Sequence, residues 1–218
     1  MQQKSSNIDL TNVDNAKDYI SLGNACHAQG QFEKAVEAYK SAISINSKNP
    51  TAYLNLGVTY IAQGQMPEAT SMLQKAIEIE PNNASAHINL GTIYANRGQL
   101  DPAISAFHRA LEITPNNANA HYNLGITYID QGCFTEAINA LQKSIEIEPK
   151  NANALLNLGV AYANLGMLEE AIIAYKRAIL INPKNSSENY NFETAYRAQG
   201  RLEEAIAAYR IKSTKAPV

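Results

Sequence analysis

The sequence contains no tryptophan, only two cysteines and no long apolar run. A helix that crosses a bilayer needs about 20 predominantly apolar residues, and no segment offers them. The first fifteen residues, MQQKSSNIDLTNVDN, lack the apolar core of a signal peptide. We therefore expect a cytoplasmic protein that has no membrane partner.

An excess of charge of one sign is also missing. Eighteen lysine and arginine residues stand against 20 aspartate and glutamate residues, which gives a formal net charge of −2. Proteins that bind nucleic acid through its phosphates carry a surplus of positive charge. We therefore do not expect a nucleic-acid partner.

Motifs for catalysis or metal binding are absent too. The four histidines have no H-E-x-x-H or C-x-x-C context, and no segment matches a phosphate-binding loop. His87 and His121 stand 34 residues apart at equivalent places, so we expect them to pack rather than to bind a metal. The sequence thus predicts a non-enzyme with no catalytic residue, no metal and no cofactor.

A repeat dominates what is present. The phrases SLGNACHAQGQFEKA, NLGVTYIAQGQMPEA and NLGTIYANRGQLDPA follow one another at intervals of 34 residues. Two glycine series and one proline series keep the same interval: Gly23, Gly57, Gly91, Gly125 and Gly159; Gly30, Gly64, Gly98, Gly132, Gly166 and Gly200; Pro81, Pro115, Pro149, Pro183 and Pro217. This period is typical of stacked helix–turn–helix units.

Each copy of the repeat predicts two helices. Tyr53, Leu56 and Tyr60 keep three- and four-residue spacing, so they share one helix face. A second apolar stripe at helical spacing follows, formed by Ala69, Leu73, Ala76 and Ile77. Gly57, Ala69 and Ala76 are small and would let the two helices of one hairpin approach closely.

Glycine, proline and asparagine mark the predicted helix ends. Gly64 can adopt the backbone conformation that ends the first helix. Pro81 lacks the amide hydrogen needed to continue the second helix. Asn83 can cap the free amides of the next one. Gly57, inside the first helix, leaves room for the second.

The motif L-G-x-x-Y, followed by G, A, an aromatic residue or Leu, A and P, resembles the tetratricopeptide repeat family over about 16–217. The resemblance implies an all-α fold, a right-handed α-solenoid of six helix–turn–helix repeats. After a flexible segment at 1–15, the units are placed at 16–49, 50–83, 84–117, 118–151, 152–185 and 186–217. The sixth unit departs most, because Glu193 and Lys212 replace small residues, so we expect looser packing there.

The two cysteines fall in the first and the fourth predicted unit. Units that contact only their neighbours cannot bring Cys26 and Cys133 to the Cα separation of about 5.5 Å that a disulfide needs. We expect two free thiols. Cys26 should lie in the core, and Cys133 should lie partly exposed on a turn.

An asparagine recurs just before the L-G pair of the first helix, and in the last unit it stands before Phe192. The members of this asparagine ladder are Asn55, Asn89, Asn123, Asn157 and Asn191. A carboxamide has both donors and an acceptor, which match a peptide main chain. The ladder is similar to the asparagine-lined groove in the tetratricopeptide arm of the glycosyltransferase that adds N-acetylglucosamine to Ser and Thr. The alternative is that asparagine is a common residue of the repeat, exposed without a role.

An apolar stripe runs beside the ladder on the predicted first helices. Its members are Leu54, Ile88, Tyr122, Leu156, Val58 and Ile126. Exposed, it would form part of an interaction site. The alternative is that these side chains pack against the neighbouring first helix.

The residues that clamp a C-terminal carboxylate in chaperone-binding members of the family are nearly absent. Ile20, Leu54, Ile88 and Tyr122 stand at the corresponding places, and only Lys17 and Asn24 resemble a fragment of that clamp. We therefore expect no tight binding of peptides with an acidic chaperone tail.

Together these features predict a non-catalytic protein–protein interaction scaffold that binds a peptide or partner segment in a concave groove. One alternative is a substrate-recruiting arm that works with a separate glycosyltransferase-type enzyme. Another is a structural repeat protein that self-associates through its sixth unit.

Overall fold

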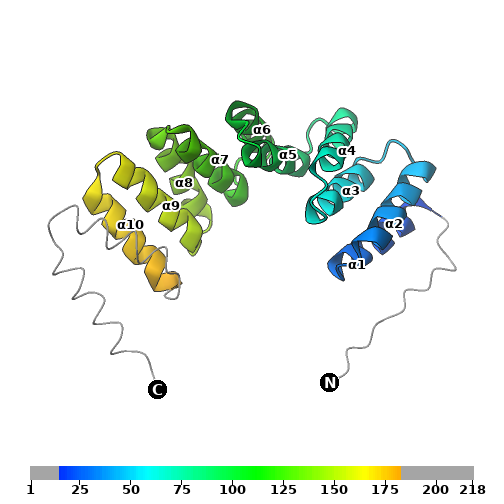
Figure 1. The fold of residues 1–218 in the computed structure, drawn as a ribbon, viewed down its shortest axis with the longest axis horizontal. Coiled ribbons are helices and arrows are strands. Elements are labelled where there is room, and N and C mark those ends of the chain that lie inside the picture. The colour runs from blue at the N-terminus through cyan, green and yellow to red at the C-terminus, as the bar shows by residue number, and fades with distance from the viewer. Residues whose placement is uncertain (1–14, 183–218) are drawn as a thin grey trace, which may run out of the picture. The chain divides into compact units, whose positions relative to one another are not determined.

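The computed structural model describes residues 15–182, and within this range the fold is all-α, with ten helices and no strand (Figure 1). The predicted fold class is therefore confirmed. The predictions for residues 1–14, for the unit 186–217 and for Asn191 lie outside the described residues.

The helices alternate between the two kinds that the repeat predicts. The first helices are α1 (Ala16–Ala28), α3 (Pro50–Ala62), α5 (Ala84–Asn96), α7 (Ala118–Gln131) and α9 (Ala152–Asn164). The second helices are α2 (Phe32–Ile45), α4 (Met66–Ile79), α6 (Leu100–Ile113), α8 (Phe134–Ile147) and α10 (Leu168–Ile181).

The chain divides into two compact units, 1–97 and 98–218. In the first, α1 packs on α2 and α3 on α4, while α2 meets α3 and α4 meets α5. In the second, α7 packs on α8 and α9 on α10, while α6 meets α7 and α8 meets α9. Among the described helices of each unit, contacts are confined to near neighbours along the chain, as expected for stacked repeats.

Every described first helix begins with an asparagine cap. Asn49, Asn83, Asn117 and Asn151 each accept a hydrogen bond from the backbone amide three residues later, at 2.9 to 3.1 Å. Asn15 caps α1 in a similar way, through the amides of Lys17 and Asp18. The predicted cap at Asn83 is confirmed. Such a cap stabilises a helix by about 1 kcal/mol relative to alanine.

Close approach of the paired helices depends on a glycine in the first one. A Cβ placed on Gly57 would lie 3.0 Å from Cγ of Leu73, and one on Gly125 would lie 2.6 Å from Cγ of Leu141. The prediction that Gly57 makes room for the second helix is confirmed. The turn glycine Gly64 has φ +75°, as its predicted role at the helix end requires.

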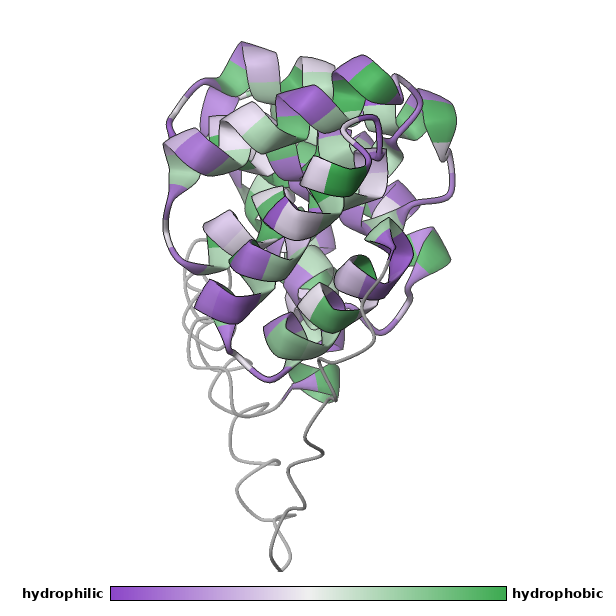
Figure 2. Ribbon diagram, turned by 90° about the vertical axis from the view of Figure 1, so that its right-hand side faces the viewer, coloured by the Kyte–Doolittle hydropathy of each residue, from purple (hydrophilic) through white to green (hydrophobic). Residues whose placement is uncertain are grey.

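Apolar residues at these contacts form the core of each unit. In the first unit, Leu56, Tyr60 and Leu73 are buried together, and Tyr53 and Ile77 pack against them. Cys26 belongs to the same core, and Cys133 is half-buried in a turn, so both predictions for the thiols are confirmed. Hydrophilic and hydrophobic residues alternate along the helices (Figure 2).

One core position in the second unit holds a polar group. Ser144 is fully buried, and its hydroxyl has no hydrogen-bond partner among the described residues. The equivalent residues of α2, α4, α6 and α10 are alanines, namely Ala42, Ala76, Ala110 and Ala178, all of them buried. Ser144 is thus a small defect in an otherwise apolar contact.

Candidate peptide-binding face of the first helices

Four members of the asparagine ladder lie in the described residues, one on each of the first helices α3, α5, α7 and α9. Asn55 and Asn89 belong to the first unit, and Asn123 and Asn157 to the second. All four side chains are half-buried, so each retains access to solvent. A half-buried carboxamide can be held in place by its neighbours and still offer polar atoms to a ligand.

Asn55 is tied to the preceding first helix. Its Nδ2 donates to Oδ1 of Asn24 at 2.8 Å, and the same oxygen accepts the hydroxyl hydrogen of Tyr39, also at 2.8 Å. Both lone pairs of that oxygen are thereby used. The pair Asn24 and Asn55 forms a lateral polar link between α1 and α3.

Asn89 and Asn157 are instead folded onto their own helices. Nδ2 of Asn89 donates to the carbonyl oxygen of Ser85 at 2.8 Å, and Nδ2 of Asn157 to that of Asn153 at 2.9 Å. Each bond fixes the orientation of the carboxamide and uses only one of its two amide hydrogens. In Asn89, Oδ1 accepts no hydrogen bond from a described residue.

Tyr122 connects the apolar stripe with the ladder in the second unit. Burial raises the pKa of Tyr122, and a hydrogen bond with Asn157 offsets part of that rise. The phenol of α7 therefore lies beside the ladder asparagine of α9, one repeat further on. The carboxamide of Asn123 makes no hydrogen bond to a described residue, so the four ladder asparagines differ in how they are held.

The apolar stripe is half-buried at all six positions. Leu54 packs against the core of the first unit, and Tyr122 and Leu156 pack against the core between α8 and α9. These side chains are thus partly covered by the core and partly exposed, and neither alternative is tested. The structure leaves their use in binding as a prediction.

Asn24 is the polar residue whose role sequence reasoning missed. In the sequence it resembles part of a carboxylate clamp, whereas the structure shows it binding Tyr39 and Asn55. The sequence does contain a signal that Asn24 has a special role, because the equivalent positions of the next four repeats hold Val58, Thr92, Ile126 and Val160. An asparagine there is an exception within the repeat.

Other polar side chains bridge consecutive hairpins at their turns. Gln63 donates to Glu33 at 3.3 Å in the first unit, and the equivalent Gln131 donates to Asp101 at 2.7 Å in the second. These contacts join the turn of one hairpin to the start of the preceding second helix. They serve the stack rather than the ladder.

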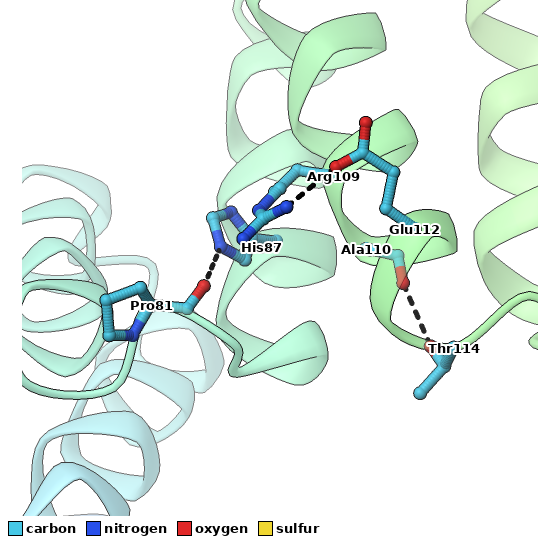
Figure 3. A network of polar contacts seen from close by, with 6 residues as sticks. All are labelled: Pro81, His87, Arg109, Ala110, Glu112 and Thr114. Atoms are coloured by element: carbon cyan, nitrogen blue, oxygen red, sulfur yellow. Dashed lines mark hydrogen bonds and ion pairs between the residues drawn. The ribbon is translucent and has the colours of Figure 1, made fainter.

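The histidines have structural surroundings. His87 donates through Nε2 to the carbonyl of Pro81 at 3.0 Å (Figure 3). The equivalent His121 binds the carbonyl of Pro115 in the same way at 2.9 Å, so both close the loop before their own helix. His108 lies 3.0 Å from the hydroxyl of Tyr128. Within residues 15–182, no group of three or more His, Cys, Asp or Glu side chains could hold a metal ion.

Surface ion pairs on the second helices are separate from this face. In α6, Arg109 and Glu112 form an ion pair at 2.7 Å. At the end of the same helix, the hydroxyl of Thr114 donates a hydrogen bond to the carbonyl oxygen of Ala110 (Figure 3).

In the described part of the chain, no helix combines the length and apolar character that a membrane span requires.

One family model matches almost the whole chain. It is described as the C-terminal domain of cilia and flagella-associated protein 70, a tetratricopeptide-type domain, and it matches residues 3–217. No curated protein sequence matches the chain at a significant level.

Solved structures of several repeat proteins are similar to the chain. A crystal structure of the MamA protein is 30% identical, with 78% of this chain and 92% of that chain covered and a TM-score of 0.69. A crystal structure of YrrB, described as a TPR protein with an unusual peptide-binding site, is 28% identical, with 81% and 91% covered and a TM-score of 0.69. Pseudomonas aeruginosa pilF is 17% identical, with 90% and 89% covered and a TM-score of 0.78, a likeness that shows the fold alone.

Proposed function

Since the chain belongs to the tetratricopeptide-type family of the cilia and flagella-associated protein 70 C-terminal domain, we propose that it is a non-catalytic protein-interaction scaffold. Within each compact unit, the first helices bind an extended segment of a partner protein. The asparagine ladder holds the main chain of that segment, and the apolar stripe covers its apolar side chains.

The observation that carries this proposal is the way Asn89 is held. Its Nδ2 is anchored on the carbonyl of Ser85, which leaves Oδ1 as an oriented acceptor on a half-buried side chain. A peptide N–H is the natural donor for such an oxygen. An anchored carboxamide also loses little rotamer freedom when it binds, which favours affinity.

The apolar stripe supplies what hydrogen bonds to a main chain cannot. Bonds to peptide amides contribute about 1 kcal/mol each, because they replace bonds to water. The exposed parts of Leu54, Ile88 and Tyr122 add apolar area next to the asparagines. An extended segment with apolar residues at alternate positions fits this combination, since its side chains point to opposite sides in turn.

The likeness to YrrB supports the same function, since that protein is described as having a peptide-binding site. The alternative functions remain predictions: the recruiting arm of a glycosyltransferase-type enzyme, and self-association through the sixth unit. The similarity to the N-acetylglucosamine transferase arm rests on the ladder alone.

The test compares two triple variants in affinity capture from native lysate. The first carries Asn89→Ala, Asn123→Ala and Asn157→Ala. The matched control carries Asn96→Ala, Asn116→Ala and Asn139→Ala, which change exposed asparagines outside the ladder. Proteins retained by wild type and control, and lost from the ladder variant, are the expected partners.

The affinity of a synthetic segment from such a partner then gives the size of the effect. We expect the ladder variant to bind at least tenfold more weakly, a loss of about 1.4 kcal/mol, and the control to bind like wild type. Equal affinity in all three proteins would remove the ladder from the function. Recovery of a transferase would favour the recruiting arm, and concentration-dependent sedimentation of the chain alone would favour self-association.

A further inference from the structure

The outer side of α10 differs from that of the other second helices. At two exposed positions, seven residues apart, α2, α4, α6 and α8 carry polar residues. The first position holds Glu37, Ser71, Ser105 and Asn139, and the second holds Ser44, Glu78, Glu112 and Glu146. In α10 the same positions hold Ile173, which is 56% exposed, and Leu180, which is 73% exposed.

The change at the second position also removes an ion pair. In α4, α6 and α8 a basic residue binds the glutamate three residues later, and the pairs are Lys75–Glu78, Arg109–Glu112 and Lys143–Glu146, at 2.6 to 2.7 Å. In α10 the basic residue is Arg177, and Leu180 stands where the acid would be. Arg177 is exposed and forms no ion pair with a described residue.

Ile173, Arg177 and Leu180 lie on one side of α10, because intervals of four and three residues return to the same helix face. We call these three residues the outer face of α10. The turn that leads into this helix is also more apolar than its counterparts. Leu165 and Met167 are exposed in this turn, and the equivalent positions of the first hairpin hold Gln29 and Gln31.

We propose that the outer face of α10 is a second docking surface, which binds an acidic amphipathic helix of a partner protein. Two exposed apolar residues at a seven-residue interval match the apolar stripe of a helix laid alongside. The unpaired Arg177 between them selects a partner with a carboxylate on the edge of that stripe. Exposed apolar side chains gathered on one surface mark an interaction site.

A second copy of the chain fits this face poorly. A two-fold axis between two outer faces of α10 would pair Ile173 of each copy with Leu180 of the other. The same axis would place the two Arg177 side chains against each other, which is unfavourable without an acid between them.

An anionic membrane fits poorly as well. Interfacial helices carry a polar face rich in lysine and arginine. In α10, Lys176 and Arg177 are balanced by Glu169 and Glu170, all of them exposed. A protein helix of opposite charge pattern is the occupant that the residues favour.

The test uses the full chain and two synthetic helical peptides of about 18 residues, or five turns. Both carry leucines at intervals of three and four residues. One has glutamates along the edges of this stripe, and the other has lysines in their place. Fluorescence anisotropy at physiological salt measures binding of each peptide to wild type and to the variants Leu180→Glu and Arg177→Glu.

We expect the acidic peptide to bind wild type at least about tenfold more tightly than the basic one, which corresponds to 1.4 kcal/mol. Leu180→Glu should abolish most of this binding, and Arg177→Glu should remove the preference for the acidic peptide. Leu180→Glu also restores the acid that α4, α6 and α8 carry, so its helicity and thermal midpoint should equal those of wild type. Ile45→Ser, at a 52% exposed position of α2, is the matched control and should bind like wild type.

Several results would overturn the proposal: no binding of the acidic peptide, equal binding of both peptides, or binding that Leu180→Glu leaves unchanged. Two others would replace it. Co-sedimentation with phosphatidylserine vesicles that is lost in Leu180→Glu would assign the face to a membrane, and self-association lost in the same variant would assign it to a second copy. The ladder variant should bind the acidic peptide like wild type, so this proposal and the ladder can fail separately.

Discussion

The first and fifth hairpins place a tyrosine at the same point of the repeat, in different surroundings. Tyr39 packs over Gly23 and donates to Asn24. Tyr175 packs over Gly159, but Val160 stands where Asn24 would be, and the hydroxyl makes no hydrogen bond to a described residue. The contact between the two paired helices is the same in both hairpins, whereas the residue beside the tyrosine hydroxyl differs.

This difference separates two kinds of position in the repeat. Residues at the contact of paired helices are set by volume, so Gly23, Gly57, Gly125 and Gly159 each face a large side chain. Residues next to that contact are free of this constraint and can serve a partner, as the asparagine ladder and the outer face of α10 are proposed to do. Substitutions of the first kind should change stability, and those of the second kind should change binding.

The largest expected effect is at the helix contact. Alanine at Gly159 would place its Cβ in the ring of Tyr175, and alanine at Gly23 would do the same with Tyr39. Overpacking of this kind costs about 1–3 kcal/mol. We expect each variant to unfold at lower urea concentration, followed by far-UV circular dichroism. Asn153→Ala, at an exposed position of α9, is the control, and an unchanged midpoint for Gly159→Ala would contradict the close contact.

The next effect concerns the buried hydroxyl of the fourth hairpin. Ser144→Ala removes a polar group without a described partner, and should stabilise the protein by about 1 kcal/mol. The reverse change, Ala178→Ser, should destabilise the fifth hairpin by a similar amount, because it buries a hydroxyl at the equivalent place. Thermal midpoints of both variants measure this, and a loss of stability in Ser144→Ala would show that its hydroxyl is satisfied.

A smaller effect separates the two tyrosines. Tyr39→Phe deletes the hydrogen bond to Asn24 and should cost about 0.5–1.5 kcal/mol. Tyr175→Phe deletes a hydroxyl that makes no hydrogen bond to a described residue, so its unfolding midpoint should stay within error of wild type. Equal losses in both variants would mean that Asn24 contributes nothing.

The same tyrosines make the stability of the folded protein depend on pH in the alkaline range. Burial raises the pKa of Tyr39 and of Tyr175 to about 12, above the ordinary value of 10. Below pH 10 both phenols are neutral in the folded and in the unfolded chain, so this contribution to stability is complete. It is lost as the pH rises from 10 to 12, because the unfolded phenols ionise first. Unfolding midpoints between pH 9 and 12 should fall less steeply in the double variant Tyr39→Phe and Tyr175→Phe, and an equal slope would contradict the burial of these phenols.

Much of the fold could be predicted from the sequence, because the residues that set it recur at a fixed interval. Gly57 faces Leu73, Gly64 has a positive φ and Asn83 caps α5, as their spacing indicated. Each of these roles depends on neighbours within one hairpin. The handedness of the solenoid, the unit boundaries and the sixth unit remain predictions.

The polar details could not be predicted in the same way. The link from Asn55 to Asn24 joins two hairpins and depends on where each side chain lies. The outer face of α10 could have been found, since Leu180 breaks a series of glutamates in the printed sequence. Both features depend on a residue that departs from the repeat, Asn24 in one and Leu180 in the other, so the 34-residue interval does not indicate them.

The most direct test of the central proposal replaces single main-chain amides of a bound partner segment with esters. An ester lacks the N–H that Oδ1 of Asn89 is proposed to accept, while its side chains stay the same. At one position along the segment, we expect the ester to weaken binding to wild type by about 1 kcal/mol and to have no effect on binding to Asn89→Ala. Equal affinity of wild type for the amide and the ester at every position would contradict recognition of the main chain by the ladder.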